Sequence, residues 1–213
     1  MRSRGRESQL MSGRLTVTIF ALVVLAATTL LPRWGLSQSA APTAVRYTSD
    51  GKLIRPEGYR EWIFASSGLG MNYGPAGAEA PAFTNVFVAP WAYKQYMATG
   101  HWPDKTVFVL EVYSAASHGS INKQGHYQDA LLGVESEVKD VSRFAEQWAY
   151  FSFGTDGKTA SKIPQEKCWS CHHQNGAVEN TFTQFYPTLL QVAYRKNTIK
   201  PSVRLTLGAA SAH

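Results

Sequence analysis

The clearest strand pattern lies between Thr106 and Tyr113, where β-branched, aromatic and other apolar side chains fill both sets of alternating positions. Phe108, Leu110 and Val112 share one face of the strand that this pattern predicts, and Glu111 belongs to the other face. Shorter runs rich in β-branched and aromatic residues predict three further strands, over 85–88, 131–138 and 148–153. The Gly-, Ser- and Asn-rich stretch 117–128 is expected to be a long loop between strands.

Helices are fewer. One is predicted over 90–99, because a proline opens it and Gly100 follows its last residue. Others are expected over 141–147 and over 182–196, where Pro187 is expected to open the second half. This order of elements predicts an α+β fold, an antiparallel β-sheet packed with a few helices.

The N-terminal segment has the three parts of an export signal. Arginines come first, an uncharged apolar run follows from Leu15 to Leu31, and small residues follow at 37–41. We expect residues 1–39 to be a signal peptide, with an uncleaved membrane anchor as the alternative. Both place the rest of the chain outside the cytoplasm. Residues 40–57 are interpreted as a lead-in segment, 58–204 as one domain and 205–213 as a C-terminal tail.

The basic charge of the chain belongs mostly to that N-terminal segment. Five arginines and one glutamate in residues 1–39 account for four of the six net positive charges, so that +2 remains. A charge this small gives no electrostatic reason to expect nucleic-acid binding.

The chemistry is concentrated at residues 168–172, which read Cys-Trp-Ser-Cys-His. Cys-x-x-Cys-His is the attachment signature of a c-type haem. Cys168 and Cys171 can bond the two vinyl groups on one porphyrin edge, and His172 then reaches the iron. A thiol redox pair needs no following histidine, and a structural zinc site needs a second pair of ligands. The chain has only these two cysteines, and His173 is interpreted as a neighbour of the ligand.

The position of the motif counts against the small all-helical cytochromes c as the model for this chain. In that class the motif lies near the N-terminus and a methionine ligand follows it. Here the motif lies near the C-terminus, and all four methionines precede Cys168.

Short fragments in a specific order make most of residues 51–190 resemble the cytochrome P-460 family, whose relatives include the beta-type cytochromes c-prime. The fragments are Tyr59-Arg60-Glu61-Trp62, Asn85-Val86-Phe87-Val88, Thr99-Gly100, Val138-Lys139-Asp140, Trp148-Ala149-Tyr150-Phe151, the haem motif, and Phe182-Thr183-Gln184-Phe185-Tyr186-Pro187. The resemblance implies an antiparallel sheet carrying a covalently attached haem c, a periplasmic location, a homodimer, and iron with an open distal position.

One position departs from the family's enzymes. In true P-460 enzymes a lysine on the strand before a glutamate bonds to the haem macrocycle, and this bond accompanies hydroxylamine oxidation. Here the glutamate is matched to Glu111, and Leu110 precedes it. Leucine has no nucleophile, so the crosslink is not expected, and whether the chain is an enzyme stays open.

Three functions remain. The leading one is binding of small diatomic ligands such as nitric oxide at five-coordinate, His172-ligated iron, in a pocket of Leu110 and Phe108 with Phe83 or Phe87. An oxidoreductase acting on hydroxylamine or nitric oxide needs an acid or base near the iron. An electron carrier, with a redox partner protein, needs a sixth ligand, for which the candidates are Met71, Met97, His101, His118 and His126. Arg60 and Lys139 are interpreted as haem propionate partners or as ordinary ion pairs.

Overall fold

The computed structural model describes residues 45–71 and 80–210 of the chain. The predicted signal peptide, residues 1–39, lies outside the described residues. Among the described residues, no helix has the length and apolar character that crossing a membrane requires.

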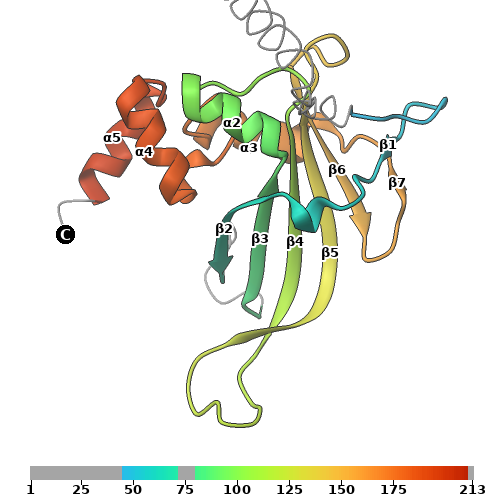
Figure 1. The fold of residues 1–213 in the computed structure, drawn as a ribbon, viewed down its shortest axis with the longest axis vertical. Coiled ribbons are helices and arrows are strands. Elements are labelled where there is room, and N and C mark those ends of the chain that lie inside the picture. The colour runs from blue at the N-terminus through green and yellow to red at the C-terminus, as the bar shows by residue number, and fades with distance from the viewer. Residues whose placement is uncertain (1–44, 72–79, 211–213) are drawn as a thin grey trace, which may run out of the picture. The chain divides into compact units, whose positions relative to one another are not determined.

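An antiparallel sheet of five strands forms the centre of the described domain (Figure 1). Its order follows the sequence: β2 (Ile63–Leu69), β3 (Ala82–Val88), β4 (Val107–Ala116), β5 (Tyr127–Lys139) and β6 (Trp148–Gly154). Two short strands, β1 (Leu53–Ile54) and β7 (Thr159–Ala160), pair separately. The predicted antiparallel α+β fold is therefore confirmed, although β2 was not expected from the sequence.

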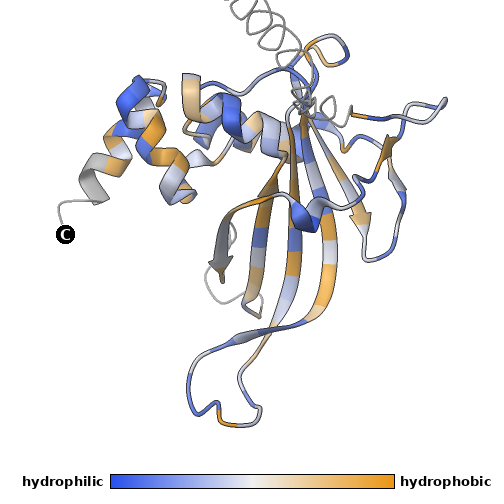
Figure 2. Cartoon of the chain, viewed as in Figure 1, coloured by the Kyte–Doolittle hydropathy of each residue, from blue (hydrophilic) through white to orange (hydrophobic). Residues whose placement is uncertain are grey.

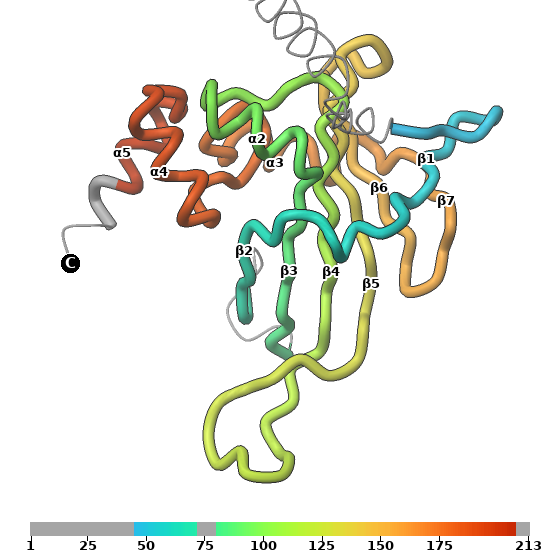
Figure 3. Tube along the Cα trace, in the orientation of Figure 1, coloured from blue at the N-terminus to red at the C-terminus, as the bar shows by residue number. Residues whose placement is uncertain are grey.

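Strands β4 and β5 are longer than their neighbours and continue into a projecting hairpin (Figure 3). The loop between them covers 117–126, so the predicted loop was placed correctly except for its last two residues, which belong to β5.

Helix α2 (Pro90–Thr99) has the predicted bounds, and Gly100 ends it in the left-handed conformation with φ of 77°. The helix predicted over 141–147 is wrong. These residues form the turns that join β5 to β6, where Phe144 N–H donates to the Asp140 carbonyl and Gln147 adopts a positive φ. The connection is too short for a helix that also returns the chain to the sheet.

The C-terminal part holds three helices and a short 3₁₀ turn. Helix α3 (Gln165–Asn175) carries the haem motif and was not predicted. The helix expected over 182–196 is divided into the 3₁₀ helix η2 (Thr183–Phe185) and α4 (Pro187–Lys196), with Pro187 opening the second part as expected. Helix α5 (Pro201–Ala210) runs through residue 204, where the sequence suggested the domain ends. A further 3₁₀ helix, η1 (Tyr59–Glu61), precedes β2.

Hydrophobic and polar bands alternate along the central strands (Figure 2), and each face of the sheet has its own core. One face packs on α2 and α4 through buried residues such as Phe108, Trp102 and Leu189. The opposite face is covered by the segment around Leu53 and Tyr59, which packs on Val109 and its neighbours. The first face extends beyond its helices into an open cavity beside α3.

Candidate functional site

Helix α3 presents the haem motif to this cavity. The helix starts after Pro164, a residue suited to a helix start, and ends at Gly176. Cys168 and His172 are one helical turn apart and therefore lie on the same face, and both line the cavity. Cys171 faces a neighbouring groove that shares Phe182 with the cavity. The two thiols are free and half-buried.

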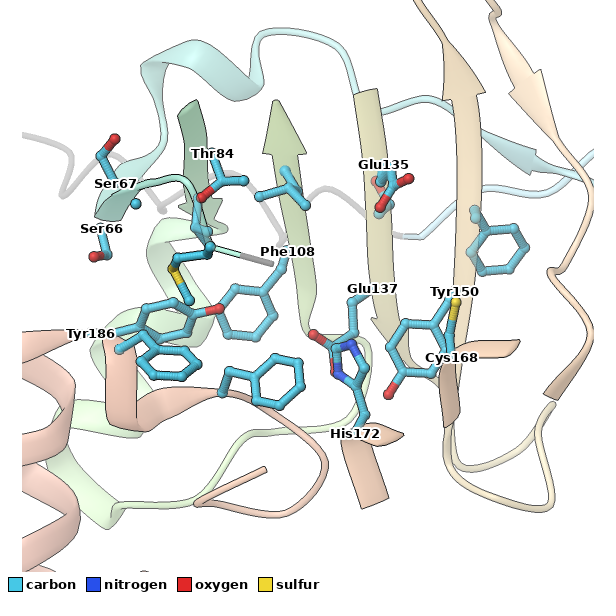
Figure 4. A pocket seen from close by; sticks show the side chains of 18 of the residues that line it. Ser66, Ser67, Thr84, Phe108, Glu135, Glu137, Tyr150, Cys168, His172 and Tyr186 are labelled. Atoms are coloured by element: carbon cyan, nitrogen blue, oxygen red, sulfur yellow. The ribbon is translucent and has the colours of Figure 1, made fainter. Parts of the chain in front are cut away.

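The cavity has a volume of about 230 Å³, and the sheet forms one of its walls (Figure 4). Leu110 and Phe108 line it, as predicted. Its other lining residues include Ser66, Thr84, Val86, Glu135, Glu137, Tyr150, Phe182 and Tyr186. Strand register explains the set, because Val86 pairs with Leu110, Leu110 pairs with Glu135, and directly paired residues share a face.

The same register corrects two expected pocket residues. Phe87 pairs with Val109 and its ring packs against Tyr59 and Phe64, on the opposite face of the sheet. Phe83 pairs with Tyr113 and belongs to that opposite face as well. Neither phenylalanine lines the cavity.

His172 is held from three sides. Its Nδ1 lies 3.0 Å from the backbone carbonyl oxygen of Asn180. The rings of Tyr150 and Phe182 pack against the imidazole, with centroid distances of 4.4 Å and 4.3 Å. A hydrogen bond from one ring nitrogen to a carbonyl is the usual way in which proteins orient a metal-binding histidine. With Nδ1 engaged in this way, Nε2 is the nitrogen left for a metal.

The loop after α3 approaches the helix so closely that a side chain at residue 176 has no room. A β-carbon on Gly176 would lie 2.6 Å from the His172 carbonyl oxygen and 2.9 Å from the carbonyl carbon of Asn180. Gly176 N–H donates to the same His172 carbonyl, at 2.8 Å. Glycine is therefore the residue that lets the Asn180 carbonyl reach the histidine ring.

Long-range contacts fix the tight turn that contains Asn180. Glu179, in the left-handed conformation with φ of 53°, accepts a hydrogen bond from Lys139 Nζ at 2.7 Å. Trp102 Nε1 donates to Thr181 Oγ1 at 3.0 Å. Of the two roles open for Lys139, the structure shows the ion pair: its Nζ is buried between Glu179 and the carbonyl of Trp102.

Two carboxylates in the cavity were missed from the sequence. Glu135 and Glu137 point from β5 into the cavity, and Figure 4 shows Glu137 beside His172. Solvent in the cavity reaches Glu135, yet the surrounding protein desolvates its carboxyl and raises its pKa, with only the charge of His172 opposing. Burial also works against the charged form of His172, but the Glu137 carboxylate and the Asn180 carbonyl outweigh it and raise the pKa of His172.

The pKa values of two other groups in the wall are raised. Burial, followed by the charge of Glu135, raises the pKa of the Cys168 thiol. A protonated thiol is unlike the activated thiolate of a redox pair. Burial, followed by the charge of Glu137, raises the pKa of Tyr150. The Tyr150 hydroxyl therefore stays protonated, and it has no hydrogen-bond partner within the described residues.

Glu111 lies on the reverse face of β4, as the regular strand predicted. It is buried, and it accepts hydrogen bonds from the Tyr59 hydroxyl at 2.6 Å and from Arg60 Nε at 2.7 Å. Arg60 therefore forms an ion pair with Glu111 and does not face the cavity. Position 110 is a leucine on the cavity face, and no lysine lines the cavity among the described residues.

Of the five candidates for a sixth iron ligand, the structure brings one to the cavity. Met71 lies at its edge and is 37% exposed. Met97, His101, His118 and His126 do not line it.

The residues present fit a covalently attached haem. Two thiols and an oriented imidazole lie on one helix, beside a cavity with a largely apolar wall. The buried polar atoms Glu137 Oε1 and Tyr150 Oη have no hydrogen-bond partner in the described part of the chain. Unpartnered buried polar atoms are uncommon in a protein interior, and a group bound in the cavity is one way to satisfy these two.

A family model described as Cytochrome P460 matches residues 56–183, which include β2 to β6, the haem motif and the Asn180 turn. No curated protein matches the chain.

Proposed function

The chain belongs to the cytochrome P460 family, and on that premise we propose that it is an exported mono-haem c-type cytochrome that binds small neutral diatomic molecules such as nitric oxide or carbon monoxide. In this proposal Cys168 and Cys171 carry the haem through thioether bonds, and His172 Nε2 holds the iron. The haem supplies an iron coordination position that can accept a ligand.

The observation that carries the proposal is the contrast between the two sides of the cavity. On α3, one imidazole is oriented by the Asn180 carbonyl, and among the described residues it is the only histidine that lines the cavity. On β3 and β4, Val86, Leu110 and Phe108 present apolar groups. These apolar groups offer no hydrogen bond to water or to an anion, so the part of the wall that they form favours neutral diatomic ligands.

The test is the optical spectrum of the purified haem protein in the ferric state, the ferrous state and the ferrous state with carbon monoxide. The proposal predicts an ordinary high-spin c-type spectrum that shifts on carbon monoxide addition. A low-spin six-coordinate resting spectrum that carbon monoxide leaves unchanged contradicts it and favours an electron carrier, for which Met71 is the ligand at the cavity edge. A strongly red-shifted ferrous band indicates a modified haem and contradicts the reasoning from Leu110.

Glu135 favours a second candidate, an oxidoreductase acting on hydroxylamine or nitric oxide. Glu135 lies beside Leu110 on the adjacent strand and on the same cavity face, and burial raises the pKa of its carboxyl, as expected for a proton donor in an active site. Turnover of hydroxylamine by the wild type with an added electron acceptor, and loss of that turnover in Glu135→Gln while carbon monoxide still binds, would support this candidate. The homodimer and the periplasmic location stay predictions, which gel filtration with light scattering and cell fractionation test.

A further inference from the structure

A second acceptor lies beside the nitrogen of His172 that the Asn180 carbonyl engages. Glu137 lies beside His172 (Figure 4), with Oε1 3.5 Å from Nδ1. The carbonyl oxygen of Asn180 is 3.0 Å from the same nitrogen. A neutral imidazole carries one N–H, and it is on Nδ1 when Nε2 holds the iron, as proposed. The Asn180 carbonyl accepts the hydrogen bond from this N–H, and the Glu137 carboxylate places a negative charge next to it.

The fold delivers Glu137 to this place. On β5, Glu137 pairs with Phe108 of β4 and with Tyr150 of β6, two residues whose side chains line the cavity. Its side chain is 11% exposed, and Oε1 has no hydrogen-bond partner within the described residues. The one ion pair that it makes in the described part of the chain is with His172.

The neighbouring side chain of Tyr150 carries no charge that could offset the charge of Glu137. Tyr150 packs on the His172 ring, and burial together with the charge of Glu137 raises its pKa. The phenol therefore stays neutral and adds no charge of its own. A buried carboxylate is costly unless a partner offsets it, and the groups placed here to offset it are the His172 ring and what the ring binds.

We propose that Glu137 is a positioning residue that strengthens His172 as an electron donor to haem iron. The negative charge of a carboxylate beside Nδ1–H stabilises positive charge on the ring and makes the imidazole a stronger electron donor at Nε2. A more basic ligand stabilises ferric iron relative to ferrous iron. This inference rests on the proposed ligation by His172. It adds that Glu137 influences the reduction potential of the iron.

The experiment is a potentiometric titration of the purified holoprotein and of Glu137→Gln, which removes the charge while keeping the shape. Glu166→Gln is the matched control, because it removes one charge from an exposed position on α3. We expect the ferrous-to-ferric ratio at a fixed potential to rise about tenfold in Glu137→Gln, which is about 59 mV for a one-electron couple. We expect little change in Glu166→Gln. Glu137→Asp shortens the side chain by one methylene group and so moves the carboxylate away from His172. We therefore expect a smaller rise in the ferrous-to-ferric ratio.

Resonance Raman spectra of the ferrous protein provide a readout that a purely structural role leaves unchanged. We expect the iron–histidine stretching frequency to fall in Glu137→Gln and to remain at the wild-type value in the control. Equal ratios and frequencies in Glu137→Gln and Glu166→Gln, with carbon monoxide binding retained, overturn the role of Glu137 and leave the proposed function standing. Absence of an iron–histidine band from the wild-type spectrum overturns the proposed function. If Glu137→Gln retains no haem, the Glu137→Asp comparison decides, and an unchanged ratio there overturns the role.

Discussion

The backbone carbonyl of Asn180 lies 3.0 Å from Nδ1 of His172, so a main-chain atom eight residues downstream orients the ring. The contact depends on Gly176, on the turn around Glu179 and on the distant side chains of Lys139 and Trp102. Each of these residues can be substituted while His172 is left unchanged.

Replacing Gly176 by alanine is expected to displace the Asn180 turn from the helix. The new β-carbon would meet the His172 carbonyl oxygen at 2.6 Å. We expect a loss of about 1–3 kcal/mol in the free energy of unfolding, the usual cost of overpacking. Thermal and urea unfolding measure it. Gly133→Ala is the control, because the nearest atom to its β-carbon would be 4.0 Å away; equal losses in both variants contradict the role of Gly176.

Removing the ion pair between Lys139 and Glu179 is expected to loosen the same turn from the opposite side. Lys139→Met leaves Glu179 without its 2.7 Å partner and leaves the carbonyl of Trp102 without a donor. We expect a loss of about 1–3 kcal/mol in stability. A double-mutant cycle with Glu179→Gln isolates the pair, and a coupling energy near zero would show that the two residues act independently.

Asp140 is expected to make stability depend on acid pH. Burial acts to raise its pKa, but hydrogen bonds from Lys105, Ser142 and Tyr47, together with the Lys105 charge, outweigh burial and lower it. The folded carboxyl therefore titrates below the unfolded value of about 3.9. Its contribution is complete above that value and disappears as the pH falls through the folded pKa.

The check is Asp140→Asn, followed by urea unfolding from neutral pH down to well below the unfolded carboxyl value of about 3.9. We expect the variant to be less stable than the wild type at pH 7, by about 1–3 kcal/mol, and the difference to shrink at the acid end. A difference that is the same at both ends would mean that the charge of Asp140 contributes nothing.

Each cysteine of the motif is expected to carry one thioether bond. Cys168→Ala should retain covalent haem through Cys171, with a shifted ferrous absorption band, and the double variant should retain none. Haem staining of denaturing gels measures this directly. Covalent haem in the double variant would show that attachment does not use these thiols.

Elements with strong local signals could be predicted from the sequence. Strand β4 has a continuous run of β-branched and aromatic residues, and α2 has both a proline at its start and a glycine at its end. Helix α3 was missed because its face toward the site is made of cysteine and histidine, so it shows no apolar stripe. The turn at 141–147 resembled a helix in composition, but the two strands that it joins leave no room for one.

The carboxylates of the site were missed for a different reason. On β5, Glu135 and Glu137 alternate with Val134, Ser136 and Val138, which is the pattern of a strand with one face in water. Only the pairing of these glutamates with Leu110 and Phe108 on β4 shows that the charged face of β5 lines a cavity. The Asn180 contact was beyond sequence reasoning, because it is made by a main-chain carbonyl that any residue would supply.

The haem motif and the Asn180 turn lie within one short stretch of chain, whereas the sheet wall unites strands that start more than a hundred residues earlier, at Ile63. Closing a short loop costs less conformational entropy than assembling distant strands, and contacts of low sequence separation form sooner. On the proposed route of export as an unfolded chain, both thiols and His172 are therefore available on one short segment before the sheet has formed. We expect the prosthetic group to be tethered first and the sheet to fold against it afterwards.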